Sequence, residues 1–119
     1  MINNTNKAFT FREFFSEFLG TFLVIYFPCW AVILFISEKM TIQEVALITT
    51  AIYLLAIWMS RSYSNCYLNP ALTVSALYLK QISTNKALYC IVSQLIGAYM
   101  GSLMVYYTVP HILLNKAEQ

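Results

Sequence analysis

The tripeptide Asn69-Pro70-Ala71 opens a short apolar segment and combines three residue types that favour the start of a helix. Asparagine is a good N-cap because its side-chain oxygen accepts a hydrogen bond from a free backbone N–H. Proline is tolerated at the first helical position, where its missing N–H would be unpaired anyway. The beginning of a helix carries about half a positive elementary charge. We therefore expect a helix over residues 70–79 whose positive end, with the amide NH2 of Asn69, faces water or a polar solute.

Other residue types give no sign of catalysis, metal binding or a bound cofactor. The three cysteines, Cys29, Cys66 and Cys90, are odd in number and lack paired spacing, which argues against a disulfide framework. The single histidine, His111, has no neighbouring ligand residue. The sequence shows no Ser/His/Asp or Cys/His set and no nucleotide-binding loop. We predict that the protein is not an enzyme and holds no cofactor.

The composition is that of a membrane protein. Of 119 residues, 60% are hydrophobic and only 10% are charged, and the mean hydropathy is +0.65. A soluble domain carries about 25% charged residues. The formal net charge of +2 and the absence of a basic run argue against a nucleic-acid partner. The partner that this composition predicts is the lipid bilayer.

Three apolar stretches, residues 14–36, 42–60 and 87–109, are long enough to cross a bilayer, which takes about 20 residues. The apolar segment that holds residues 70–79 is too short, so it is predicted to be a buried or re-entrant half-helix. Pro110 is expected to end the third stretch. The predicted fold class is an all-α membrane protein with three transmembrane helices and one re-entrant half-helix.

The distribution of basic residues predicts the orientation of the chain. Cytoplasmic loops carry an excess of lysine and arginine. With the N-terminus inside, the cytoplasmic side would hold Lys7, Arg12, Arg61, Lys80 and Lys86. The outer side would hold Lys39 and Lys116. We therefore predict a multi-pass protein with its N-terminus in the cytoplasm and its C-terminus outside.

Four blocks of the sequence, taken together, resemble the N-terminal half of the aquaporin (major intrinsic protein) family. The segment SNCYLNPALT at residues 64–73 resembles the first signature loop of that family. The segments SEFLGT at 16–21 and AIYLLA at 51–56 are similar to its first and second helices. Residues 86–98 resemble its third helix. The resemblance implies that residues 1–119 form a single half-repeat of an inverted-repeat channel fold.

The resemblance also implies roles for particular residues. Asn69, with Pro70 and Ala71, would orient the passing solute at the membrane midplane. The backbone carbonyls of the loop before it would line the inner half of the pore, and these belong to Ser64, Asn65, Cys66 and Tyr67. Glu17 and Gln94 would support the loop. Thr49 falls where the family places a residue of its narrow filter.

The sequence departs from the family pattern at several of these positions. Asn65 replaces the usual glycine, and Tyr67 replaces the usual histidine. Thr49 stands where a bulky aromatic residue is usual, and Tyr53, one helical turn away, could refill that space. These changes leave the solute open. The sequence also has no second Asn-Pro-Ala motif, no filter arginine and no helices corresponding to the second half of the family fold.

Several sequence features allow more than one interpretation. Glu17 is either a support for the loop or an interfacial charge near Arg12 or Arg61. Cys66 is either a pore-facing thiol or a small buried residue. Small residues let helices approach closely, and we expect close packing at the glycines without knowing which helix is the partner. These glycines are Gly20, Gly97 and Gly101.

One copy of this chain would leave the N–H groups at the start of its half-helix facing lipid, at a cost of several kcal/mol each. Something must therefore cover them. We expect a subunit of a passive channel for water or small neutral solutes, completed by an inverted second copy in a homo-oligomer or by a separate second-half chain. The alternative is a non-conducting, truncated or vestigial fragment that acts, if at all, as a membrane interaction protein.

Overall fold

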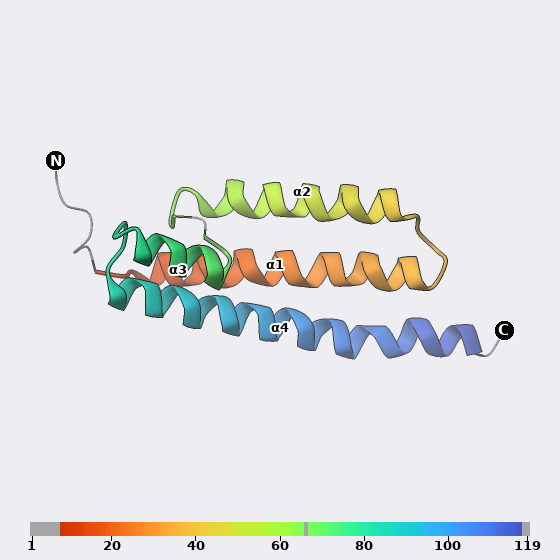
Figure 1. Ribbon diagram of the computed structural model, residues 1–119. Coiled ribbons are helices and arrows are strands. Elements are labelled where there is room, and N and C mark those ends of the chain that lie inside the picture. The colour runs from red at the N-terminus through yellow and green to blue at the C-terminus, as the bar shows by residue number, and fades with distance from the viewer. Residues whose placement is uncertain (1–7, 66, 118–119) are drawn as a thin grey trace.

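The computed structural model describes residues 8–65 and 67–117, with side chains described as far as residue 109. This part of the chain is built from four helices and contains no strand: α1 (Phe11–Ile36), α2 (Ile42–Ser60), α3 (Pro70–Tyr78) and α4 (Thr84–Ala117) (Figure 1). The all-helical fold class that the sequence predicts is confirmed.

Capping boxes start the first two helices. Thr10 accepts a hydrogen bond from the backbone N–H of Glu13, whose carboxylate accepts from the backbone N–H of Thr10 over 2.9 Å. Thr41 and Glu44 repeat this arrangement at the start of α2, with 2.7 Å for the returning bond. Each box satisfies N–H groups that the first turn of a helix leaves unpaired. As a result α1 begins at Phe11, ahead of the boundary near residue 14 that hydropathy predicts.

The third long helix extends beyond both boundaries that the sequence predicts. α4 begins at Thr84 and its backbone continues through Pro110 to Ala117. The prediction that Pro110 ends this helix is therefore wrong. A proline removes one backbone donor, but the neighbouring hydrogen bonds can persist. Pro28 lies inside α1 in the same way.

Three of the helices are long and apolar enough to span a membrane. The spans are Phe11–Ile36, Ile42–Ser60 and Thr84–Val109, with mean hydropathies of 2.3, 1.7 and 1.6. Large apolar side chains are exposed along all three, as expected for surfaces in contact with lipid. α3 has 9 residues and is about 14 Å long, so it cannot cross a hydrocarbon core of about 30 Å.

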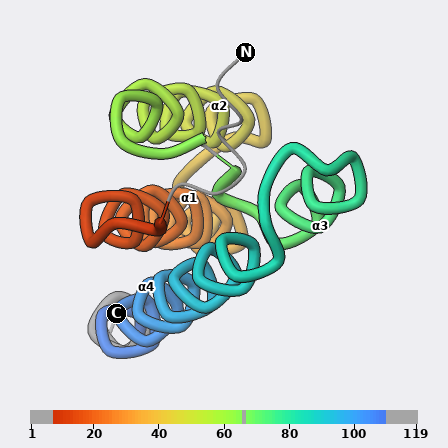
Figure 2. The backbone as a smooth tube through the Cα atoms, turned by 90° about the vertical axis from the view of Figure 1, so that its left-hand side faces the viewer, coloured from red at the N-terminus to blue at the C-terminus, as the bar shows by residue number. Residues whose placement is uncertain are grey.

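The three long helices form a layer with α1 in the middle, and α3 lies beside this layer (Figure 2). α1 packs against α2 on one side and against α4 on the other, and α3 packs against α4 (Figure 2). α3 begins alongside the interior part of α1 and runs back toward the end of the bundle where α4 starts (Figure 1). The start of α3 therefore lies within the depth of the bundle, and its end lies near one surface.

Close contacts join α1 to both neighbours. A Cβ at Gly97 of α4 would overlap the backbone carbonyl oxygen of Phe18, and one at Gly101 would lie 3.1 Å from that of Phe22. The partner of both glycines is therefore α1. On the other side, the hydroxyls of Ser16 and Ser60 each donate to the backbone carbonyl of the other residue over 3.3 Å.

Candidate functional site

A wholly buried carboxylate lies where α1 meets α4 and the loop before α3. Glu17 of α1 has an exposed fraction of 0%. Its oxygens accept hydrogen bonds from the Ser64 hydroxyl over 2.7 Å, the Leu68 backbone N–H over 2.9 Å and the Tyr67 backbone N–H over 3.3 Å. A buried carboxylate is stable only when its oxygens are well supplied with donors. Here the donors come from the loop between α2 and α3, so this loop is fastened to α1.

Glu17 has no ion pair with the arginines considered as its alternative partners. Within the described residues, no salt bridge joins it to Arg12 or to Arg61. Glu13, one turn earlier on α1, does form one, with the Lys86 ammonium at 2.7 Å. The two acidic residues of α1 therefore differ in their partners. Glu13 ties α1 to α4 by charge, and Glu17 accepts from backbone and side-chain donors.

Gln94 and Thr73 extend the hydrogen bonds of Glu17 to the other helices. The amide nitrogen of Gln94 donates to Glu17 over 2.8 Å and to the Thr73 hydroxyl over 3.0 Å. The Thr73 hydroxyl donates to the Asn69 backbone carbonyl over 3.1 Å. Gln94 and Thr73 are both fully buried. The network thus connects α1, the loop, α3 and α4 through groups that each have a partner.

Thr73 was not singled out from the sequence, although it has a recognisable signal. It stands four residues after Asn69 and so lies on the same face of the short helix. A threonine there can bond back to the carbonyl of the residue four positions earlier. The hydroxyl oxygen can then accept a hydrogen bond from another helix, as it does here from Gln94. This pattern would have marked Thr73 as a residue that joins α3 to its neighbour.

The loop backbone takes an unusual conformation at Leu68. Its φ is +49°, in the left-handed region that costs a non-glycine residue of the order of 1 kcal/mol or more. Two contacts hold it there. Its N–H bonds to Glu17, and its buried side chain occupies the space beside Gly20, where a Cβ would overlap it. Gly20 is therefore needed to seat the loop on α1.

Asn69 is the N-cap of α3, as its residue type suggests. Its backbone is extended, with φ −152° and ψ 124°, and its side-chain oxygen accepts from the Ala71 N–H over 2.9 Å. Pro70 is the first helical residue. Asn69 is exposed, and within the described residues its amide NH2 has no hydrogen-bond partner. The NH2 group and the positive end of α3 are therefore available to a further molecule or chain.

The two loop residues that depart from the family pattern contact each other. The Asn65 amide nitrogen donates to the Tyr67 hydroxyl over 3.1 Å. Tyr67 is half-buried against a small core of Ala76, Ile82 and Ala87. The remaining predicted site residue of this loop, Cys66, lies outside the described residues. That the carbonyls of residues 64–67 line a passage stays a prediction.

Thr49 and Tyr53 lie on α2, apart from the network around Glu17. Both are half-buried, and they are one turn apart on one face of the helix. Neither takes part in the hydrogen bonds that fix the loop. Within the described residues, no three His, Cys, Asp or Glu side chains are grouped so that they could hold a metal ion.

The structure is that of an integral membrane protein. It has three helices that can span a membrane and a short helix that begins on a loop fixed inside the bundle. The chain belongs to the major intrinsic protein family, whose model matches residues 4–119.

Relatives with curated descriptions are much longer than this chain. The glycerol uptake facilitator protein of Buchnera aphidicola is 29% identical over 116 residues, which cover 96% of this chain and 44% of the relative. Aquaporin A of Dictyostelium discoideum is 31% identical, with 86% of this chain and 38% of the relative covered. Aquaporin-5 of Sus scrofa is 34% identical, with 83% and 37% covered. The chain thus spans less than half the length of these relatives. No solved structure is significantly similar.

Proposed function

We propose that this chain forms one half of the wall of a passive membrane channel for water or small neutral solutes. One observation carries the proposal. The buried carboxylate of Glu17 holds a loop that ends in the N-cap Asn69 and the start of α3, within the depth of the bundle. Irregular backbone persists at membrane depth only where protein buries it or where it lines a water-filled cavity. Membership of the major intrinsic protein family supports the second case.

The proposed mechanism is selective passage without chemistry. The amide NH2 of Asn69 donates a hydrogen bond to a passing water or hydroxyl oxygen, and the loop carbonyls of residues 64–67 accept from it. The first turn of α3 contributes about half a positive charge, which raises the barrier for cations. Thr49 and Tyr53 narrow the passage from the side of α2. Two relatives named as a glycerol uptake facilitator and an aquaporin support a small neutral solute.

A second half must complete the passage in this proposal. It is supplied either by a second, inverted copy of the chain or by a separate chain that carries the complementary half. Three spans place the two ends of residues 1–119 on opposite sides of the membrane, and this is the property that allows inverted halves to pair. In this proposal residues 1–119 together form one half-repeat of the channel.

The proposed orientation has the N-terminus in the cytoplasm and the C-terminus outside. Arg12, Arg61, Lys80 and Lys86 all belong to the end of the bundle where α1 and α4 begin, and Lys39 belongs to the other end (Figure 1). The excess of basic residues favours the first end as the cytoplasmic one. Lys7 and the side chain of Lys116, which also entered the prediction, lie outside the described residues.

Osmotic shrinkage of liposomes tests whether copies of this chain are sufficient. Reconstitution from detergent inserts the chain in both orientations, so inverted pairs can form whatever the charge bias. Vesicles with the chain are expected to shrink faster than empty vesicles after an osmotic step, and Asn69→Asp is expected to abolish the difference. Shrinkage at the rate of empty vesicles would exclude the inverted homo-oligomer. Completion by a separate chain or a non-conducting fragment would then remain.

A further inference from the structure

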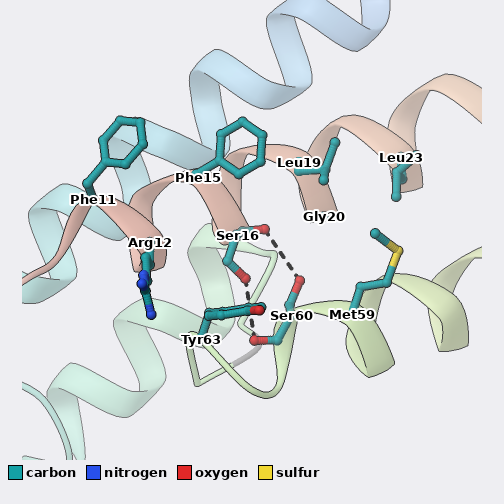
Figure 3. A pocket seen from close by; sticks show the side chains of 10 residues that line it. All are labelled: Phe11, Arg12, Phe15, Ser16, Leu19, Gly20, Leu23, Met59, Ser60 and Tyr63. Atoms are coloured by element: carbon teal, nitrogen blue, oxygen red, sulfur yellow. Dashed lines mark hydrogen bonds between the residues drawn. The ribbon is translucent and has the colours of Figure 1, made fainter.

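A groove of about 480 Å³ lies between the first half of α1 and the end of α2 (Figure 3). Its length is lined by apolar side chains, namely Phe15, Leu19 and Leu23 of α1 and Met59 of α2. Arg12 and Tyr63 lie at one end of it, and Leu23 and Met59 lie at the other. The loop support at Glu17 is not among the residues that line it. The groove is therefore a second feature of the molecule, which borders the candidate site at Gly20 but lies outside the hydrogen bonds of Glu17.

The polar side chains on the floor of the groove already have hydrogen-bond partners. Gly20 contributes no side chain, and the hydroxyls of Ser16 and Ser60 are each engaged with the carbonyl of the other residue (Figure 3). A long apolar ligand can lie on such a floor without desolvating a free donor or acceptor. Its apolar lining runs from Phe15 to Leu23 along α1, so the groove suits a linear hydrocarbon chain.

The mouth of the groove is positively charged. Arg12 lines it directly, and Arg61 lines an adjoining hollow that shares Met59 and Tyr63 with it. Within the described residues, neither arginine has a carboxylate or hydrogen-bonding side chain as partner. Lys86, near the same end of the bundle, is neutralised by Glu13 at 2.7 Å. Arg12, Arg61 and Lys80 therefore keep their charge unpaired at this end of the bundle within the described residues, and of these three only the arginines line the groove or its adjoining hollow.

We propose that this groove binds one anionic phospholipid, with an acyl chain along Leu19, Leu23 and Met59 and its headgroup phosphate between Arg12 and Arg61. The planar guanidinium group matches phosphate in geometry and charge. The length also fits. From Arg12 to Leu23 the helix rises about 16 Å, which is about half of a hydrocarbon core of about 30 Å. The lipid would thus occupy one leaflet.

Quenching of Trp58 by brominated phospholipid tests this proposal. Trp58 lies in the hollow that contains Arg61, and a Trp30→Phe variant makes it the only tryptophan. In phosphatidylcholine vesicles, brominated phosphatidylglycerol is expected to quench Trp58 more strongly than brominated phosphatidylcholine at equal mole fraction. The unmodified chain, with both tryptophans, gives the same comparison if the variant fails to fold.

The arginine variants give the decisive comparison. Arg12→Gln and Arg61→Gln are each expected to lower the preference for the anionic lipid by about fivefold, from the attraction of one basic residue to an anionic surface. Lys80→Gln removes the same charge at the same end of the bundle but outside the groove, and it should leave the preference unchanged. Added inorganic phosphate should not relieve the quenching, since it lacks the acyl chain.

Three results would overturn the proposal. Equal quenching by the two brominated lipids would show that the groove has no anionic preference. If Lys80→Gln lowered the preference for the anionic lipid as much as Arg12→Gln, the effect would be a general one of charge at the membrane surface. No quenching by either lipid would show that protein, such as a second copy of the chain, covers the groove. None of these measurements depends on conduction, so they separate this proposal from the proposed function.

Discussion

The backbone N–H of Leu68 lies 2.9 Å from the Oε2 atom of Glu17, and the two residues are 51 positions apart in the sequence. Both are buried. This bond holds Leu68 at φ +49° and fixes the point at which the chain turns into α3. The position of Asn69 therefore depends on a carboxylate in another helix.

Replacing Glu17 with glutamine should destabilise the fold by about 3 kcal/mol, because hydrogen bonds to a charged acceptor are lost and an amide NH2 now faces the N–H of Leu68. Unfolding of the chain in detergent micelles, followed by circular dichroism, measures this change. Glu38→Gln removes the same charge from an exposed residue and should stay within about 0.5 kcal/mol of the unmodified chain. Equal effects of the two substitutions would show that Glu17 does not support the loop.

Replacing Thr73 with valine should cost about 1–2 kcal/mol, because it removes a hydroxyl that donates to Asn69 and accepts from Gln94 while keeping the shape of the side chain. Ser75→Ala is the matched control on the same helix, since the Ser75 hydroxyl bonds to the Ala71 carbonyl in an exposed position. The same unfolding measurement applies. A loss for Ser75→Ala as large as for Thr73→Val would contradict the role of Thr73 in joining α3 to α4.

Replacing Gly97 with alanine should destabilise the bundle by about 1–3 kcal/mol, since the new methyl group overlaps the Phe18 carbonyl oxygen and the backbones must separate. Gly101→Ala meets the Phe22 carbonyl oxygen at 3.1 Å and should have a smaller effect. Thermal unfolding of both variants gives the order. If Gly101→Ala were the more harmful substitution, the closest approach of α1 and α4 would lie elsewhere.

Replacing Tyr53 with alanine should raise the permeability to glycerol relative to water, because the proposed passage widens beside Thr49. The comparison is made by light scattering on vesicles that carry a conducting form of the chain. Leu54→Ala removes a large side chain from a neighbouring exposed position on α2 and should leave the ratio unchanged. A ratio that moves equally in both variants would place Tyr53 outside the passage.

The long elements of this fold could be predicted because they depend on hydropathy alone. Each span is an apolar stretch of sufficient length, and α3 is revealed by its shortness and by Asn69 and Pro70. The boundaries were less accurate. The Thr10–Glu13 capping box, visible as a Thr-x-x-Glu pattern, places the start of α1. The backbone of α4 passes Pro110 because the loss of a single donor does not by itself end a helix.

The contacts of the candidate site could be predicted only in part. Glu17 and Gln94 were identified by resemblance, and their mutual bond is a tertiary contact between α1 and α4 that no local pattern specifies. The positive φ of Leu68 could not be predicted, since a leucine rarely takes it without outside support. The partner of Gly97 likewise depends on which helix lies opposite, and this is decided by packing of the whole bundle.

A chimeric channel tests most directly whether this chain is a competent channel half. The segment of the Buchnera aphidicola glycerol uptake facilitator that this chain matches is replaced by this chain, and glycerol uptake into liposomes is followed by light scattering. We predict uptake faster than in empty vesicles and abolished by Asn69→Asp, with the unaltered facilitator as the control for the assay. If the intact, inserted chimera took up glycerol no faster than empty vesicles, the proposal that this chain forms half of a conducting wall would be contradicted.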